Sequence, residues 1–325
     1  MSDSSLEGER FKRAIADLRA LIFDPSLVCS SLMEPEAAAE LGLSPLTATR
    51  VITTERMGWG LRFAEPDYQR ALKVALERQL SSFTGQRLGL YAERLLLAHL
   101  EALPEHRVLA HDLQLYTYTP HKRTLGALDV LVESPRGVEH WELAVKYFLR
   151  RAPSASWGAW LGPNERDTMA KKLKKMLGHQ LPLSLTREAE EQLDALGLPR
   201  PESRALLCVG RLFEAASPSA GGVDELSARP LGYPLDYPSG AWARRSEWLE
   251  AQVRSAQERR WVVRAYPDWL HSDPELLMSL PRLTAGEVAA QQLERGKYLM
   301  LSELDAEGRE RRRWFLLSDD WGRSV

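Results

Sequence analysis

The sequence is poor in cysteine, and this scarcity excludes two common structural devices. Its 325 residues contain only Cys29 and Cys208, too few for a disulfide framework or for a zinc site built on cysteines. Both lie among apolar residues, which favours buried, reduced thiols. We therefore expect a cytoplasmic protein.

Long apolar runs and an excess of one charge are also missing. No stretch approaches the roughly 20 apolar residues that span a bilayer, and the first residues, MSDSSLEGERFKR, lack the apolar segment of a secretory signal. We expect no membrane association. The net charge of −2 argues against a protein that coats nucleic acid non-specifically, but it leaves room for a local basic groove.

Several catalytic motifs are absent as well. The chain contains no HxH or HExxH metal motif, no Walker-type glycine loop and no G-x-S-x-G. These absences remove the sequence support for zinc-dependent hydrolysis, for P-loop nucleotide binding and for Ser-His-Asp catalysis.

Apolar periodicity divides the chain into three regions. Residues 1–84 are predicted to be mainly helical, with helices at 8–22 and 66–80. Residues 85–214 predict a helix ending before Pro104, strands at 107–118, 124–133 and 139–149, a hairpin at 134–137, helices at 164–180 and 186–196, and a buried strand at 204–213. Residues 215–325 begin with a Pro-, Gly- and Ser-rich stretch and predict an α/β extension packed on this core.

Two neighbouring predicted strands carry acids and a lysine in otherwise apolar surroundings. Asp129 interrupts one strand, and Glu142 and Lys146 lie on the next, with small Ala144 between them. Since strand side chains alternate between faces, residues 142, 144 and 146 point the same way. Buried carboxylates repel each other unless a cation lies between them, and oxygen ligands favour Mg²⁺ or Mn²⁺. The alternative is a structural Asp129 beside a Glu142–Lys146 ion pair.

A third acid could join this site. Glu93 lies within the apolar helix that precedes the strands, where it could support the metal or its waters. The alternative is a surface carboxylate paired with a neighbouring arginine.

The helix predicted for residues 164–180 is basic and amphipathic. Lys172, Lys175 and His179 share one face, and Asn164 is a candidate N-cap. Such a face fits a phosphate backbone, and Gln180 could hydrogen-bond a phosphate or a metal-bound water. A solvated lysine face, with Gln180 as a helix cap, is the alternative. The arginine-rich run 309–313 is interpreted as a charged edge strand, although it could also touch DNA.

At this point the sequence resembles a known family. The stretches RLGLYAERLLLAHL, LAHDLQL, TLGALDVLV, HWELAVKYFL, WLGPNERD, HQLPLS and GRLF are similar to the bacterial family catalogued as domain of unknown function number 1853, most specifically in residues 86–214. That family is grouped with the PD-(D/E)XK phosphodiesterases, which include restriction endonucleases. The resemblance implies a restriction-endonuclease-like α/β core of order αβββαβ.

The resemblance also implies roles for the named residues. Glu93 would be the helix acid, Asp129 the central aspartate, and Glu142 with Lys146 the acid–lysine pair. In the superfamily the acid and lysine usually stand two residues apart, whereas here Ala144 occupies that acid position. The carboxylate of Glu142 would reach the site from about 7 Å further along the strand, at roughly 3.3 Å per residue.

The leading hypothesis is therefore a Mg²⁺-dependent nuclease acting on DNA. Asp129, Glu142 and Glu93 would serve the metal, Lys146 the attacking water or the phosphate, and Lys172, Lys175, His179 and Gln180 the nucleic-acid backbone. Two alternatives stay open: an inactive nuclease fold serving as a nucleic-acid-binding or protein-interaction scaffold, and an enzyme that acts on RNA.

Overall fold

The computed structural model describes residues 3–52, 55–84, 87–118, 121–216, 229–234, 237, 239–255, 259–265 and 268–323. The chain is of the mixed α/β class and contains a large mixed sheet. It forms two compact units: the first comprises residues 1–145, 172–209 and 231–235, and the second residues 146–171, 210–230 and 236–325. The division into three regions made from the sequence stays a prediction.

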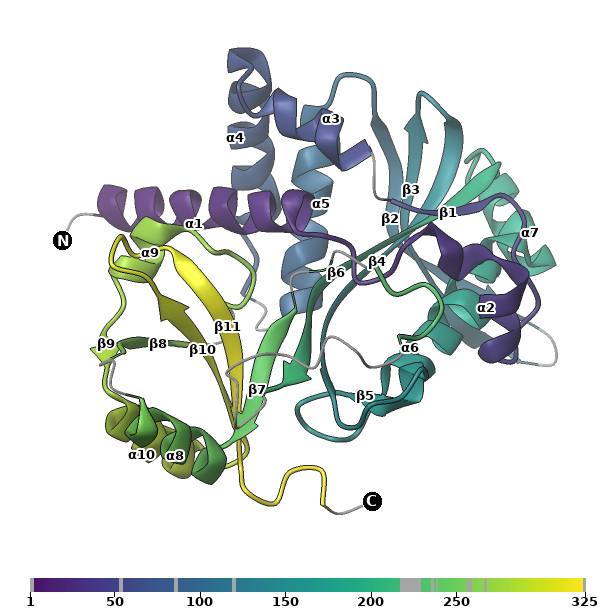
Figure 1. Ribbon diagram of the computed structural model, residues 1–325. Helices are drawn as coiled ribbons and strands as arrows, with labels where there is room; N and C mark the ends of the chain where they lie inside the picture. Colours follow the sequence, from purple (N-terminus) through teal and green to yellow (C-terminus); the bar gives the residue numbers. More distant parts are fainter. Residues whose placement is uncertain are drawn as a thin grey trace. The chain divides into compact units, whose positions relative to one another are not determined.

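The first unit opens with five helices. The predicted helices at 8–22 and 66–80 and the helix ending before Pro104 are confirmed; residues 34–64, which show no clear pattern in the sequence, contain two further helices and a short strand. In α4, Pro66 occupies the first turn, where its missing N–H costs nothing, and the apolar side chains at helical spacing are buried. The helices are α1 (Asp3–Phe23), α2 (Pro35–Glu40), α3 (Glu55–Arg62), α4 (Pro66–Leu80) and α5 (Leu88–Ala102), and α4 lies beside α5 (Figure 1).

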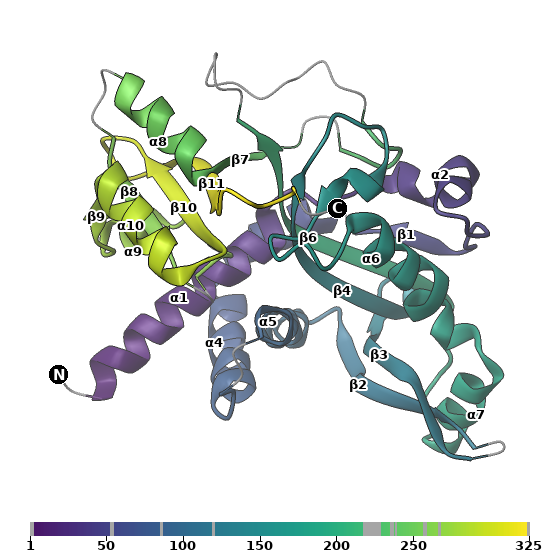
Figure 2. The same ribbon diagram turned by 90° about the horizontal axis from the view of Figure 1, so that it is seen from below.

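The strands of this unit form an antiparallel meander joined to a fourth strand. The order is β2-β3-β4-β6, and β1 (Thr49–Val51) pairs with β6 in parallel. The predicted hairpin is confirmed, because Ser134 pairs with Gly137. α7 (Arg187–Ala195) lies beside β2, as Figure 2 shows. The strands are β2 (Arg107–Thr117), β3 (Arg123–Ser134), β4 (Gly137–Arg150) and β6 (Ser203–Ala215), of which β4 and β6 continue into the second unit.

The basic helix predicted for residues 164–180 is wrong in its bounds. Helix α6 covers only Met169–Lys175; a π-helical turn at Met176–Gln180 and a 3₁₀ helix at Leu181–Leu185 follow it. A π turn widens the backbone spiral and is frequent at functional sites. The face shared by Lys175 and His179 in a regular α-helix is therefore not continuous here.

Asn164, predicted as the N-cap of this helix, lies in a preceding turn. Its side-chain oxygen accepts a hydrogen bond from the amide of Arg166, and Glu165 adopts a left-handed backbone conformation with φ of 61°. A helix cannot pass through such a residue. The hydroxyl of Thr168 instead accepts from the amide of Lys171 and serves the helix start.

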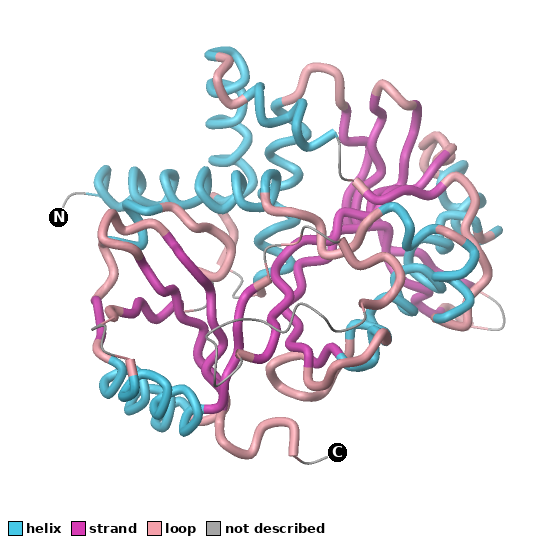
Figure 3. The backbone as a smooth tube through the Cα atoms, in the orientation of Figure 1, coloured by secondary structure: helices cyan, strands magenta, loops and turns pink. Residues whose placement is uncertain are grey.

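The second unit is built on strands packed with tryptophan. Strand order runs β6-β7-β11-β10-β8-β9, with helices α8 and α10 side by side (Figure 3). Its core contains Trp248, Trp261 and Trp314 among small and aliphatic side chains. Helix α10 begins with a capping box, in which Thr284 and Glu287 bond reciprocally. The elements are β5 (Trp160–Leu161), β7 (Gly240–Arg244), α8 (Arg245–Arg254), β8 (Trp261–Arg264), α9 (Pro274–Met278), β9 (Arg282–Leu283), α10 (Ala285–Arg295), β10 (Tyr298–Leu304) and β11 (Glu310–Leu317).

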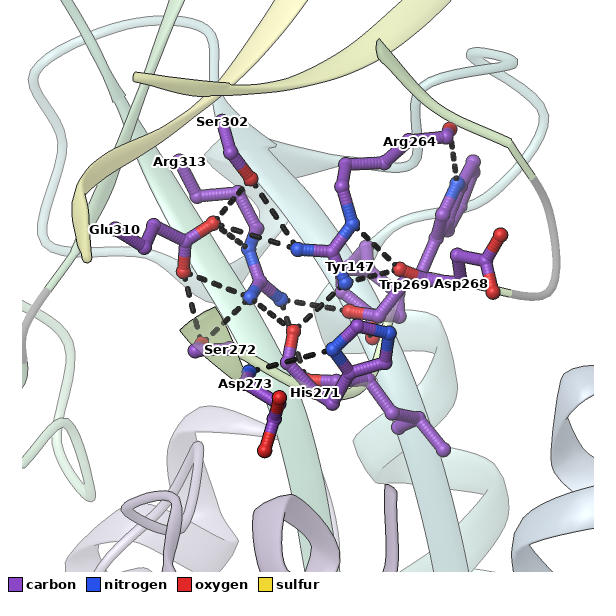
Figure 4. A network of polar contacts seen from close by, with 11 residues as sticks. Tyr147, Arg264, Asp268, Trp269, His271, Ser272, Asp273, Ser302, Glu310 and Arg313 are labelled. Carbon is purple, nitrogen blue, oxygen red and sulfur yellow. Dashed lines mark hydrogen bonds and ion pairs between the residues drawn. The ribbon is translucent and has the colours of Figure 1, made fainter. Parts of the chain in front are cut away.

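The interpretation of residues 309–313 as an edge strand stays a prediction. Strand β11 pairs with β10 along its length, whereas β7 pairs only with its second half, Trp314–Leu317. Arg313, just before that half, is buried, with 1% of its side chain exposed. A buried charge is tolerated only when it is paired, and Figure 4 shows the network that pairs it.

Within the described residues, no helix combines the length and the apolar character needed to cross a bilayer.

Candidate functional site: a buried pair of carboxyl groups

Asp129 and Glu142 lie where the β3–β4 ladder ends. The paired residues run from Ser134 with Gly137 to Val130 with Trp141, and Asp129 and Glu142 come next on their strands. Instead of a further backbone pair, a carboxylate oxygen (Oδ2) of Asp129 accepts a hydrogen bond of 3.0 Å from the amide of Leu143. The aspartate thus replaces a backbone acceptor and is held beside the neighbouring strand.

The two carboxyl groups interact directly and hold protons strongly. Burial raises the pKa of Asp129 to about 7, and the nearby charge of Glu142 adds to the effect. Burial likewise raises the pKa of Glu142 to about 7, although its hydrogen bond to Asp129 works in the opposite direction. Ionised Glu142 disfavours ionisation of Asp129, and the hydrogen bond between them couples the two titrations, so the values belong to the pair. Near neutral pH the pair is therefore partly protonated.

Glu142 is fixed by two neutral partners. The amide nitrogen of Gln180 donates to its Oε2 at 2.6 Å, and Nε2 of His140 lies 3.0 Å from its Oε1. Burial lowers the pKa of His140 to about 4, so the ring is neutral at pH 7. A neutral imidazole has one donor and one acceptor nitrogen and can bond Glu142 in either protonation state. Its other nitrogen, Nδ1, lies 3.2 Å from the hydroxyl of Ser184.

His140 and Ser184 are neighbours of the site that sequence reasoning missed. Strand alternation alone places His140 on the same face as Glu142, so the signal for His140 was present in the sequence. Nothing local signals Ser184, which reaches His140 from the 3₁₀ helix 44 residues further along.

Glu93 belongs to the electrostatic environment of the pair. It is half-buried on α5, and its negative charge raises the pKa of Glu142. Even so, no group of three or more His, Cys, Asp or Glu side chains is arranged to hold a metal ion in the part of the chain that the structure describes. A direct bond from Glu93 to a metal stays a prediction.

Lys146 lies four residues beyond Glu142 on β4, in the part of the strand that belongs to the second unit. Four residues correspond to about 13 Å of extended strand. Its side chain is half-buried. The predicted role of Lys146 at the carboxyl pair stays a prediction.

The residues predicted to bind nucleic acid separate into two groups. Gln180 and His179 turn toward the meander: Gln180 binds Glu142, and Nε2 of His179 lies 3.1 Å from the carbonyl oxygen of Leu125 on β3. Lys172 is half-buried and Lys175 is exposed on α6. The π turn redirects residues 179 and 180 from the helix surface to the strands.

The donor set fits a hard divalent cation. Both carboxyl groups offer oxygen. Burial raises both pKa values, and the charge of Glu142 adds to this at Asp129; a cation in place of the protons would offset both effects. Mg²⁺ commonly keeps several waters and is held by one or two carboxylates together with substrate phosphates, so two clustered acids suffice. Asp129 and Glu142 are the residues that would hold it.

Comparison with known proteins identifies a family for this chain. The model of the family described as Domain of unknown function (DUF1853) matches residues 17–317. No curated protein and no solved structure matches the chain.

Proposed function

Because this family model covers well over half of the chain, the chain belongs to the DUF1853 family, and from that premise and the buried acid pair we propose that it is a divalent-cation-dependent phosphodiesterase, a nuclease acting on DNA. One observation carries the proposal: half-buried Asp129 and buried Glu142 touch each other, and both have a pKa of about 7. Carboxyl groups displaced from their ordinary pKa in this way are characteristic of functional sites.

The roles follow from the contacts. A bound Mg²⁺ or Mn²⁺ would polarise the scissile phosphate and lower the pKa of a bound water. Asp129 and Glu142 provide the ligands, Gln180 and His140 hold Glu142 in position, and Glu93 adds negative charge. Lys146 is the residue proposed to orient the attacking water or to stabilise charge on the phosphate.

The arrangement of elements supports a restriction-endonuclease-like core. The order α5, β2, β3, β4, α6, β6 agrees with the αβββαβ order implied by the family resemblance, with the short elements β5 and α7 as additions. Lysines 172 and 175 on α6 are proposed to contact the phosphate backbone. Fold analogy carries less weight here than the acid pair, because one fold hosts many functions.

The test is cleavage of supercoiled plasmid, single-stranded DNA and RNA at pH 8 with Mg²⁺ or Mn²⁺ in titration. We expect cation-dependent cleavage of DNA that Asp129→Asn lowers by about 100-fold or more, as for loss of a group that acts on the transition state. Lys146→Ala tests the proposed lysine in the same assay. Glu188→Gln, in the first turn of α7 and half-buried, is the control and leaves the rate unchanged. Cleavage that survives both Asp129→Asn and Lys146→Ala contradicts the site.

A second candidate is a nuclease fold without catalysis that binds nucleic acid or a protein. Two observations favour it: among the described residues no three His, Cys, Asp or Glu side chains are arranged to hold a metal, and Ala144 stands where the resemblance places the acid next to Lys146. In this case the plasmid stays intact with every cation, while a gel-shift assay still detects DNA binding that weakens when Lys172 and Lys175 are both replaced by Gln.

A further inference from the structure

The β2–β3 hairpin of the first unit extends beyond its pairing with the rest of the sheet. Strand β3 pairs with β4 only as far as Val130, whereas β2 and β3 stay paired up to Thr117 and Arg123. The outer part of the hairpin, residues 113–118 and 121–128, is therefore a two-stranded arm in the described part of the chain. It lies beside α7 (Figure 2).

One side of this arm is held by its own unit. The supporting core contains two leucines of the arm, a leucine of the 3₁₀ helix and an alanine of α7: Leu115, Leu128, Leu183 and Ala189. The side-chain amide of Gln192 on α7 also accepts from the backbone N–H of Tyr116 at 3.3 Å and donates to its carbonyl oxygen at 3.0 Å. A two-stranded hairpin alone is marginally stable in water, so these contacts keep the arm in place.

The other side of the arm carries aromatic rings and a cation. Because side chains alternate along a strand, Tyr116 and Tyr118 point away from the side of Leu115. Tyr118 is 62% exposed, and its ring centroid lies 6.4 Å from that of Tyr116. The ammonium of Lys122 lies 4.1 Å from the centroid of Tyr116 and 6.0 Å from that of Tyr118. A cation thus covers the first ring, while the second ring is open to solvent.

No acid neutralises the cations of the arm. Its residues include the exposed Lys122 and Arg123 but no Asp or Glu, and neither cation forms an ion pair with any described residue. Three acids of the neighbouring α7 have partners: Glu191 with Arg187, and Glu190 and Asp194 with Arg200. The arm therefore presents local positive charge on a chain whose net charge is −2.

An open aromatic ring beside unpaired cations suits a partner that combines flat rings with negative charge. Single-stranded nucleic acid has both, since its bases stack on aromatic side chains and its phosphates bind Lys and Arg. The bases of a duplex are stacked on one another, so a duplex would use the cations alone.

We propose that the arm binds single-stranded nucleic acid, with a base stacked on Tyr118 and the adjoining phosphate bound by Lys122 and Arg123. The ring recognises the flat face of a base, so the site accepts any base. Lys122 is already held against Tyr116, which lowers the side-chain freedom that is lost on binding. The inference goes beyond the proposed cleavage, because it concerns binding without a cation.

Fluorescence anisotropy of labelled (dT)₁₂ with the full chain, in EDTA to prevent cleavage, tests the stacking contact. We expect saturable binding with a Kd below about 100 μM. Tyr118→Ala weakens it about tenfold, whereas Tyr118→Phe keeps the ring and binds nearly as tightly as the wild type. Phe23→Ala is the matched control, because Phe23 is also an aromatic residue of the first unit and is 51% exposed.

Three results overturn the stacking contact. They are absence of (dT)₁₂ binding, equal losses in Tyr118→Ala and Phe23→Ala, and a loss in Tyr118→Ala that is as large for a blunt duplex as for (dT)₁₂. A loss confined to single strands supports it, and the tighter-bound of (dT)₁₂ and (rU)₁₂ then identifies the sugar that the site prefers.

Lys122→Gln tests the phosphate contact separately, because it removes one cation and keeps both rings. We expect the slope of log Kd against log salt concentration to fall by about 0.7, the value for one phosphate contact on a single strand. Lys73→Gln, on the exposed surface of α4 in the same unit, is the matched control and leaves the slope unchanged. An unchanged slope in Lys122→Gln contradicts the contact.

Cleavage and strand binding fail separately. A chain that cuts no DNA but loses (dT)₁₂ binding in Tyr118→Ala supports the arm and contradicts the proposed nuclease. A chain that cuts DNA and binds (dT)₁₂ equally well in Tyr118→Ala overturns the arm and leaves the nuclease in place.

Discussion

Two buried acids in this molecule have opposite electrostatics. Glu310 on β11 is bound by Arg313 at 2.7 Å and lies 3.6 Å from Arg264 (Figure 4). Burial alone raises the pKa of Glu310, but the charges of the two arginines lower it well below its ordinary value. Glu142 on β4 is also buried and has a raised pKa instead, because burial and the charge of Glu93 outweigh its hydrogen bonds with Asp129 and Gln180.

The difference separates a structural acid from a candidate functional one. Arg264 and Arg313 satisfy Glu310 and also donate to backbone carbonyls of residues 268–271, so this network fastens a loop with charges that the chain itself supplies. Among the described residues no arginine or lysine forms an ion pair with Asp129 or Glu142. The described part of the chain pairs no positive charge with these acids, and an external cation would provide one.

The largest effect on stability that would sharpen this comparison is expected when Arg313 is replaced. Arg313→Met leaves Glu310 with one distant arginine and leaves backbone carbonyls without donors, so we expect the free energy of unfolding to fall by about 3–5 kcal/mol. Urea denaturation at pH 7 measures it. The control, Arg187→Met, breaks the exposed ion pair with Glu191 and costs less than about 1 kcal/mol. A small effect of Arg313→Met would show that the network is not structural.

At the pair of Asp129 and Glu142 we expect the loss of a charge to change the stability in the opposite direction. The pKa of Asp129 is raised in the folded state, so the native protein binds more protons than the unfolded chain between about pH 4 and pH 7. Stability therefore falls as pH rises through that window. Asp129→Asn removes the charge and keeps the acceptor for Leu143, and we expect it to stabilise the cation-free protein by about 2 kcal/mol at pH 8.

Thermal and urea unfolding in EDTA at pH 4.5 and pH 8 check this gain. Near pH 4.5 the wild type is protonated at the pair, so the two proteins have nearly equal stability. The control, Glu188→Gln, has almost no effect at either pH. A destabilisation of Asp129→Asn at pH 8 would mean that the charged carboxylate is already satisfied within the chain, as Glu310 is.

The same two regions show how far the sequence predicts this structure. Short-range patterns were sufficient for the meander: a hairpin at 134–137 brings neighbouring strands together, and alternation places Glu142 on a defined face. They were insufficient for Arg313, because its guanidinium is enclosed by Trp269, His271 and Ser272, which lie 41 to 44 residues earlier in the sequence. An arginine-rich strand has no local signal that distinguishes a buried arginine from an exposed one.

The contacts of Gln180 show a second limit. The residue was selected as a partner of phosphate or of a metal-bound water, whereas in the structure it donates to Glu142. A sequence pattern read at 3.6 residues per turn predicts a continuous basic helix, and it contains no sign of the π turn that redirects residues 176–180. The residue type at position 180 was informative, but the direction of the Gln180 side chain depends on the backbone geometry.

A bound cation should remove the electrostatic difference between the Asp129–Glu142 pair and the arginine network around Glu310. At ten times its Kd, Mg²⁺ stabilises a protein that binds it only when folded by about 1.4 kcal/mol. We expect this stabilisation at pH 8, and we expect the affinity to fall by about tenfold at pH 6, since protons compete for carboxyl groups with pKa values of about 7. Thermal unfolding with Mg²⁺ in titration measures both, and Asp129→Asn removes the effect. A stabilisation independent of pH would place the cation elsewhere.

The smallest effect concerns Gln180 as a positioning residue. Gln180→Leu removes the donor to Oε2 of Glu142, so the ionised carboxylate loses stabilisation and the pKa of Glu142 rises further. We expect Mg²⁺ affinity at pH 8 to fall by about tenfold, with the pH dependence of binding moved to higher pH. Gln192→Leu is the matched control, because Gln192 is also half-buried and its amide binds the carbonyl of Tyr116, away from the pair. A merely structural role would lower stability in both variants and leave the pH dependence of cation binding unmoved, so a shift confined to Gln180→Leu identifies the amide as part of the site.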